Sequence, residues 1–272
     1  MSAPADRKSA VTHAATRSFV CEDLQVTLYG AAGAAVILEH VDLTVGRGEF
    51  VSVLGPSGSG KTTLLRVLGG LQDKSGGTVR CQDVPVDGPP SDVVTVFQDY
   101  SHSLLPWRSV RRNVALGIES RLDRDECAKR VAAALDMVGL SDSADEYPWR
   151  LSGGMQQRVQ IARALAMRPS VLLMDEPFGA LDAMTKASLQ DQLLQVQELT
   201  GTTVVFVTHD VEEAVYLSNR VVVLEGRPAG VGLDLAVDLP SPRDQITTKE
   251  SATYLSLRHK VYEALGHGGS RA

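Results

Sequence analysis

The segment best suited to chemistry is a glycine-rich run that ends in lysine and threonine. The run consists of Gly55, Pro56, Ser57, Gly58, Ser59, Gly60, Lys61 and Thr62, and Thr63 follows it. Glycines let backbone N–H groups approach an anion closely, and a lysine ammonium can neutralise the β- and γ-phosphates of a nucleotide. The hydroxyl of Thr62 suits Mg²⁺, which prefers oxygen ligands and keeps several waters. The spacing therefore predicts a site for a nucleoside triphosphate and Mg²⁺.

The residues on both sides of this run decide between a phosphate-binding loop and an ordinary glycine-rich surface turn. Residues 50–54 are apolar and predict a buried strand, whereas residues 63–68 have the pattern of a buried helix. The beginning of that helix would present the positive end of its dipole to an anion. We therefore interpret the run as a phosphate-binding loop.

A second reactive group is an acidic pair, Asp175 and Glu176, which ends the apolar run 171–174. Ligands of open α/β sheets bind at the carboxyl ends of the strands. We expect Asp175 to hold Mg²⁺ through water, and Glu176 to orient and deprotonate the water that attacks the γ-phosphate. Asp175 alone could simply cap a turn before Pro177, but its occurrence together with the phosphate-binding loop favours the catalytic interpretation.

Short apolar runs alternate with helical patterns over much of the chain. The predicted strands include 50–54, 93–97, 171–174, 203–207 and 221–224, and the clearest helices between the later ones are 189–199 and 211–217. This alternation is typical of a mainly parallel sheet with helices on both faces. The sequence therefore predicts an α/β fold.

The stretch 99–155 interrupts the alternation. It contains no convincing strand and predicts several short helices, of which 110–116 and 126–138 are the clearest, so we expect a helical subdomain inserted into the α/β core. The core would comprise residues 18–98 and 156–240, with 241–272 as a short C-terminal extension. Residues 1–17 are rich in alanine, serine and threonine without periodicity, which predicts a disordered tail.

The overall composition limits the possible partners. A formal net charge of −6 argues against a nucleic-acid surface, which usually needs a basic face, so no nucleic acid is expected. No apolar run reaches the about 20 residues needed to span a bilayer, so any membrane role requires a partner. The three cysteines are scattered, which disfavours a disulfide framework and a zinc site and favours a reducing cytoplasm.

A third segment, residues 151–156, reads Leu-Ser-Gly-Gly-Met-Gln and begins another predicted helix. Ser152 stands at a capping position before Gly153 and Gly154, which predicts a second anion-binding helix start. A capped Gly-Gly loop is common, but this one precedes the strand that ends in the acidic pair. Here the chain resembles the ATP-binding cassette (ABC) superfamily, whose signature is Leu-Ser-Gly-Gly-Gln, with Met155 in place of the glutamine. The resemblance implies ATP as the nucleotide and a P-loop NTPase core with an inserted helical subdomain.

The resemblance also assigns roles to residues that are ambiguous by themselves. Gln98 is similar to the glutamine that senses the γ-phosphate and Mg²⁺, and His209 to the switch histidine that hydrogen-bonds the γ-phosphate. Asp182 lies in a segment that resembles the family's D-loop. Tyr29 is placed like the aromatic residue that stacks on adenine, although a packed strand aromatic is an equal interpretation. By family, Ser152, Gly153 and Gly154 close over ATP held by the Lys61 loop of a second copy.

Several segments are similar to the importer ATPases for nitrate, taurine and aliphatic sulfonates. These segments are 97–98, 104–107, 113–114, 174–182 and 239–244. The resemblance implies a homodimer, peripheral on the cytoplasmic face of the cell membrane, that binds a transmembrane permease and receives solute indirectly from an extracytoplasmic binding protein. We expect Leu104 to Trp107 to receive a permease helix, unless Trp107 packs internally.

Three alternatives are kept beside this interpretation. The chain could serve another ABC permease, for an osmolyte or for export, because those ATPases share the same catalytic residues. A soluble ABC ATPase acting on ribosomes or nucleic acid is disfavoured because no second cassette and no long coiled-coil insertion is visible. A GTPase is disfavoured because neither Asn113 nor Asn219 begins the Asn-Lys-x-Asp motif that reads guanine.

Overall fold

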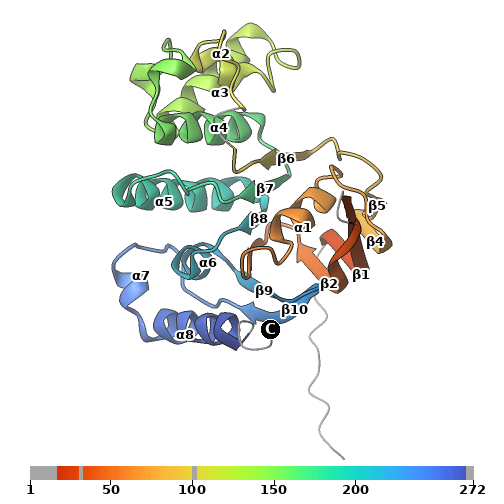
Figure 1. Ribbon diagram of the computed structural model, residues 1–272. Coiled ribbons are helices and arrows are strands. Elements are labelled where there is room, and N and C mark those ends of the chain that lie inside the picture. The colour runs from red at the N-terminus through yellow and green to blue at the C-terminus, as the bar shows by residue number, and fades with distance from the viewer. Residues whose placement is uncertain (1–16, 31–32, 100–102, 268–272) are drawn as a thin grey trace, which may run out of the picture.

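The computed structural model describes residues 17–30, 33–99 and 103–267, and Figure 1 shows their arrangement. The expected disordered tail lies outside the described residues, except for Arg17, which is the first residue of a strand. The described strands form one 10-stranded sheet in the order β5-β4-β1-β2-β10-β9-β3-β8-β7-β6. Their bounds are β1 Arg17–Gly30, β2 Gly33–Gly46, β3 Phe50–Leu54, β4 Gly76–Cys81, β5 Val84–Pro85, β6 Val93–Val96, β7 Val171–Asp175, β8 Thr203–Val207, β9 Arg220–Gly226 and β10 Ala229–Ala236.

One half of the sheet is the predicted parallel part and the other half is antiparallel. Strands β9, β3, β8, β7 and β6 pair in parallel, and every residue of β3, β7 and β8 is buried. Such fully buried strands are expected where helices cover both faces. Strands β1, β2, β4 and β5 pair antiparallel, and β10 joins them to β9. The α/β class is confirmed, but the antiparallel half was not predicted.

The helices lie on both faces of the sheet. Their bounds are α1 Lys61–Leu68, α2 Val110–Ala115, α3 Arg124–Met137, α4 Gly153–Met167, α5 Ala183–Thr200, α6 Val211–Leu217, α7 Thr247–Glu250 and α8 Ala252–His267, with short 3₁₀ helices at Ser141–Ser143 and Pro148–Arg150. Successive residues of one strand enter different cores, as alternation across a strand requires. Val205 and Val207 pack with Leu64 of α1, whereas Phe206 packs with residues of the opposite face, among them Tyr216 of α6.

Helices α2, α3 and α4 form a helical lobe beyond the β6 edge of the sheet (Figure 1). Arg163 connects α4 with α2 and with the loop at Ser103. Its guanidinium donates to the carbonyl oxygens of Ser103 and Asn113 and to the Asn113 side chain. Asn113 is fully buried, so these bonds satisfy polar groups away from water. The proposed subdomain boundary between residues 155 and 156 falls inside the continuous helix α4, so no element ends there.

The C-terminal segment after residue 240 packs onto the core. Tyr254 and Val261 of α8 are fully buried, and the Tyr254 hydroxyl donates to the carbonyl oxygen of Glu212 in α6. The Arg243 guanidinium donates to the carbonyl oxygens of Tyr216 and Ser218. This segment therefore contributes to the core next to α6. Within the described ranges, no helix combines the length and the apolar character needed to cross a membrane.

Candidate nucleotide-binding site

The glycine-rich run forms a tight loop between β3 and α1, as the flanking residues predict. Gly60 has φ 82°, and a Cβ there would come within 2.7 Å of the Leu38 side chain. A Cβ on Gly55 would lie 2.6 Å from the carbonyl oxygen of Leu224. Both positions therefore require glycine, which gives the loop its close curvature.

The Lys61 side chain folds back over the loop. Its Nζ donates to the carbonyl oxygen of Gly55 at 2.8 Å and to that of Pro56 at 3.0 Å. Burial lowers the pKa of Lys61. The nearby carboxylates of Glu176 and Asp175 raise this pKa, but their effect is smaller than that of burial. Ser59 Oγ is buried without a hydrogen-bond partner among the described residues. A buried ammonium and a buried hydroxyl without a partner suit the oxygens of a phosphate chain.

The hydroxyl of Thr62 meets the first acidic residue. Thr62 Oγ1 donates to Asp175 Oδ1 at 3.2 Å, although the two residues are 113 positions apart. Asp175 is buried, and burial raises its pKa while the bond from Thr62 lowers it. The two parallel strands that precede these residues bring their carboxyl ends to the same edge of the sheet. A hydroxyl and a carboxylate side by side supply two of the hard oxygen donors that Mg²⁺ prefers.

The Glu176 carboxylate contacts two other predicted site residues, Gln98 and His209. Gln98 Nε2 donates to Glu176 Oε2 at 3.0 Å, and His209 Nδ1 lies 3.2 Å from the same oxygen. Glu176 has φ 46°, a left-handed conformation that is uncommon outside glycine and is over-represented at functional sites. Its N–H donates to the carbonyl oxygen of Val207, which holds the strained backbone against β8.

Most of these residues line an open cavity of about 610 Å³. Its lining consists of Ile37, Gly55, Ser57, Gly58, Gly60, Lys61, Thr62, Thr63, Gln98, Glu176 and His209. The structure thus brings together the phosphate-binding loop, the carboxylate, the glutamine and the histidine that the sequence singled out. The lining combines the Lys61 ammonium with the Glu176 carboxylate and its two hydrogen-bonding partners, a set that suits an attack by water on a bound phosphate chain.

Eight predicted residues are absent from the described lining of this cavity. Three of them, Pro56, Ser59 and Asp175, lie in the phosphate-binding loop or beside it, and the other five lie elsewhere. Tyr29 lies at the end of β1 and is 83% exposed, so it is not a packed strand aromatic. Ser152 caps α4 by accepting a hydrogen bond from the N–H of Met155, and Gly153 and Gly154 begin that helix. Asp182 caps α5 by accepting from the N–H groups of Met184 and Thr185.

Sequence reasoning missed three residues next to the site. Ile37 lines the cavity beside Gly60. Arg227 follows β9, and its Nη2 donates to the carbonyl oxygen of Ser57 at 3.2 Å. Gln157 is buried in α4, donates to the carbonyl oxygen of Glu176 at 3.4 Å and accepts from the N–H of Ala180 at 3.1 Å. No local pattern marks these residues, because their partners are distant in the sequence.

The family model described as "ABC transporter" matches residues 38–179, which contain the phosphate-binding loop, the signature segment and the acidic pair. The chain belongs to the ABC transporter family. It is therefore an ATP-binding protein that hydrolyses ATP, as the sequence resemblance predicts. The P-loop NTPase fold with an inserted helical lobe is confirmed by solved ABC ATPases.

Similar proteins of known name include ATP-binding subunits of import systems. The nitrate import ATP-binding protein NrtC of Synechococcus elongatus is 47% identical over 86% of this chain, which spans 36% of NrtC. The bicarbonate transport ATP-binding protein CmpC of Synechocystis is 45% identical over 84% of this chain, which spans 35% of CmpC. The ABC ATPase chain therefore covers about a third of these longer relatives, but 90% of a putative ATP-binding protein of Brucella abortus that is 45% identical to it.

Solved structures agree with this assignment. The ATP-binding cassette MJ0796, in a dimeric post-hydrolysis state bound to ADP and Pi, superposes with a TM-score of 0.73 at 33% identity. The match covers 80% of this ABC ATPase chain and 98% of the MJ0796 chain.

Proposed function

We propose that this chain is the ATP-hydrolysing subunit of an importer for a small anion. Nitrate, taurine and aliphatic sulfonates are the candidate solutes. Support comes from the two relatives named for a solute, NrtC and CmpC, whose names specify nitrate and bicarbonate, both small anions. The observation that carries the catalytic part is the contact of Gln98 and His209 with one oxygen of Glu176, beside the Lys61 loop.

In the proposed mechanism, the Lys61 loop holds the β- and γ-phosphates of ATP. Glu176 acts as the general base. Gln98 and His209 both contact its Oε2, so we assign Oε1 to accept the proton of the attacking water. Thr62, Asp175 and Gln98 are the residues that would hold Mg²⁺, whose charge neutralises the phosphate oxygens. His209 is assigned a hydrogen bond to the γ-phosphate, and the exposed Tyr29 is assigned to the adenine ring.

We further propose that two copies form each complete site. Ser152, Gly153 and Gly154 begin α4 with N–H groups that suit an anion, yet they do not line the described cavity of their own chain. A second copy would place these residues, with Asp182, over the ATP of the first. Support comes from the similar cassette MJ0796, which is dimeric in a state bound to ADP and Pi.

The helical lobe is the proposed contact with a transmembrane permease at the cytoplasmic face of the membrane. Trp107 is 70% exposed, so the alternative that it packs internally is wrong. Leu104, in contrast, is buried in the lobe core, so it supports the surface without forming it. Between α2 and α3 the lobe has a cavity of about 490 Å³ that would accommodate apolar side chains.

The test of the proposed function is reconstitution with the permease and its binding protein. ATP turnover by the complex should rise when the binding protein carries its anion. The anions that bind to the solute-binding protein should then identify the transported solute. Trp107→Glu should reduce assembly with the permease while the ATPase of the isolated chain is kept. Turnover stimulated only by solutes without an anionic group would contradict the proposed importer, and unchanged assembly of Trp107→Glu would contradict the docking surface.

A further inference from the structure

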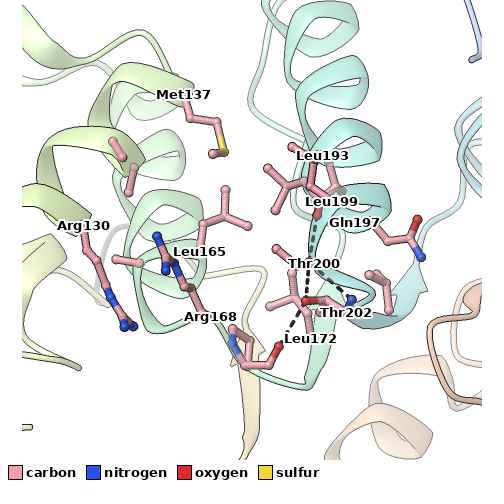
Figure 2. Close-up of a pocket in the computed structure, with 16 residues that line it drawn as sticks. Arg130, Met137, Leu165, Arg168, Leu172, Leu193, Gln197, Leu199, Thr200 and Thr202 are labelled. Carbon is pink, nitrogen blue, oxygen red and sulfur yellow. Dashed lines mark hydrogen bonds between the residues drawn. The ribbon is translucent and has the colours of Figure 1, made fainter.

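A second cavity lies between the helical lobe and the core, away from the phosphate-binding loop. It has a volume of about 250 Å³, and Figure 2 shows α3 and α4 on one side and α5 on the other. Its lining consists of Arg130, Ala133, Ala134, Met137, Leu165, Ala166, Arg168, Pro169, Leu172, Leu193, Val196, Gln197, Leu199, Thr200, Thr202 and Val204. No described residue lines both this cavity and the nucleotide-binding cavity.

Most of the residues that line this cavity are apolar. In Figure 2 Met137 and Leu165 lie on the lobe side and face Leu193 and Leu199 of α5 across the gap. The cavity opens to solvent beside Leu199, which is 87% exposed. An enclosed apolar cavity of about 150 Å³ can hold benzene, so a volume of about 250 Å³ has room for a compact apolar ligand or a short alkyl chain.

Two arginines on the lobe side give the cavity a cationic end. Arg168 ends α4 with φ 50°, a conformation that usually belongs to glycine at that place. Among the described residues its guanidinium makes no hydrogen bond or ion pair, whereas Arg130 is bonded to Glu126 at 2.9 Å. The hydrogen bond from Arg130 and the positive charges of Arg130, Arg168 and Lys129 lower the pKa of Glu126. Arg168 therefore gives the lining a positive charge without a side-chain partner among the described residues, and this charge favours an anionic group.

We propose that this cavity binds a small amphiphilic anion, with a carboxylate or sulfonate head on Arg168 and Arg130 and an apolar body between Leu165 and Leu193. Arginine recognises both head groups through paired N–H donors. A ligand in this place contacts the lobe and the core at once, so its binding stabilises their present arrangement. The site is separate from nucleotide binding and from the proposed permease contact.

The test uses calorimetric titration of the full chain with four probes that share an eight-carbon chain, namely octanoate, octane-1-sulfonate, octan-1-ol and octylammonium. We expect saturable binding of one anion per chain, at least tenfold tighter than binding of the alcohol or the amine, and a higher Tm in its presence. A preference between octanoate and octanesulfonate would identify the natural head group. No binding of either anion, or equal binding of the alcohol, would overturn the proposal.

Two variants and one control locate the ligand. Arg168→Gln keeps much of the side chain without its charge and should weaken anion binding about tenfold while leaving octanol unchanged. Ala133→Phe adds a ring at an exposed position of the lining and should abolish binding of all probes. Arg121→Gln removes the same charge from an exposed part of the lobe outside this lining and should change nothing. If both site variants bound the anions like the parent protein, the assigned cavity would be wrong.

Discussion

The beginnings of α1 and α4 are both glycine-rich helix starts that suit an anion, but their surroundings differ. At α1 no side chain caps the helix, and Lys61, Glu176, Gln98 and His209 line a cavity of about 610 Å³ around its start. At α4 the exposed Ser152 caps the helix, and its start lines no part of that cavity. The chain therefore assembles hydrolytic groups at one helix start and leaves the other open to a different molecule.

The largest effect should come from Glu176→Gln, which tests the hydrolytic groups at α1. The amide keeps the shape of the side chain but cannot accept a proton, and a general base contributes about 10²- to 10⁴-fold to turnover. We expect ATP binding to be retained, ATP hydrolysis to fall by about 10³-fold, and an ATP-dependent dimer to accumulate. The measurements are steady-state phosphate release and gel filtration with ATP.

The matched control for this variant is Glu198→Gln. Glu198 lies on exposed α5 surface and is absent from the nucleotide cavity, so the same chemical change should leave turnover unaltered. Near-normal hydrolysis by Glu176→Gln would remove Glu176 as the base and leave the cluster around its carboxylate without a catalytic explanation.

Mixing two defective variants tests whether the two helix starts serve one ATP. Lys61→Ala damages the α1 start, and Ser152→Arg damages the α4 start, so each homodimer should trap no nucleotide. In a mixed dimer one site combines both defects, and the other combines two intact starts. Trapping should therefore return to about half of the parent level per dimer that contains both variants. Nucleotide trapping is a better readout than ATP turnover, because turnover can require two intact sites in one dimer.

The control is to show by affinity tags that mixed dimers are present in the sample. If confirmed mixed dimers trapped no nucleotide, both helix starts would have to act within one chain, and the proposed shared site would be wrong.

The phosphate-binding loop and the acidic pair could be predicted because their chemistry depends on neighbouring residues. The contact between Thr62 and Asp175 also follows from a general rule, since parallel strands end at one edge of the sheet. The antiparallel half of the sheet was missed because β1 and β2 pair with several register shifts, which interrupt the alternation that marks a strand. Tyr254 was assigned to an extension, although it is fully buried against α6, because burial between distant elements has no local signal.

Gln157 offers an intermediate effect, because it is the physical link between the two helix starts. It lies in α4 and bonds to the backbone of Glu176 and of Ala180, next to Asp182. Gln157→Leu should lower the free energy of unfolding by about 2 kcal/mol, since two part-buried hydrogen bonds to the backbone are lost. Turnover should fall about tenfold through displacement of Glu176, with the KM for ATP little changed.

The control for this prediction is Gln160→Leu, one turn further along α4. Gln160 is also buried, but its Oε1 has no hydrogen-bond partner among the described residues, so the same replacement should leave turnover near the parent value. Equal losses of turnover in both variants would show that Gln157 acts only through packing of the helix.

The smallest expected effect belongs to Arg227, which supports the phosphate-binding loop from outside. Its guanidinium donates to the carbonyl oxygen of Ser57, and the side chain is exposed, so the bond should contribute about 0.5 to 1 kcal/mol. Arg227→Gln should therefore weaken ATP binding about threefold without changing the turnover number, as measured by nucleotide titration and steady-state kinetics.

The control is Arg80→Gln, which removes an exposed positive charge from β4 and should not change the affinity for ATP. Arg227→Lys keeps the positive charge and a hydrogen-bond donor but not the planar guanidinium, so an affinity like that of Arg227→Gln would show that the guanidinium geometry is what supports Ser57. Parent affinity in Arg227→Gln would show that the loop holds its shape without this support.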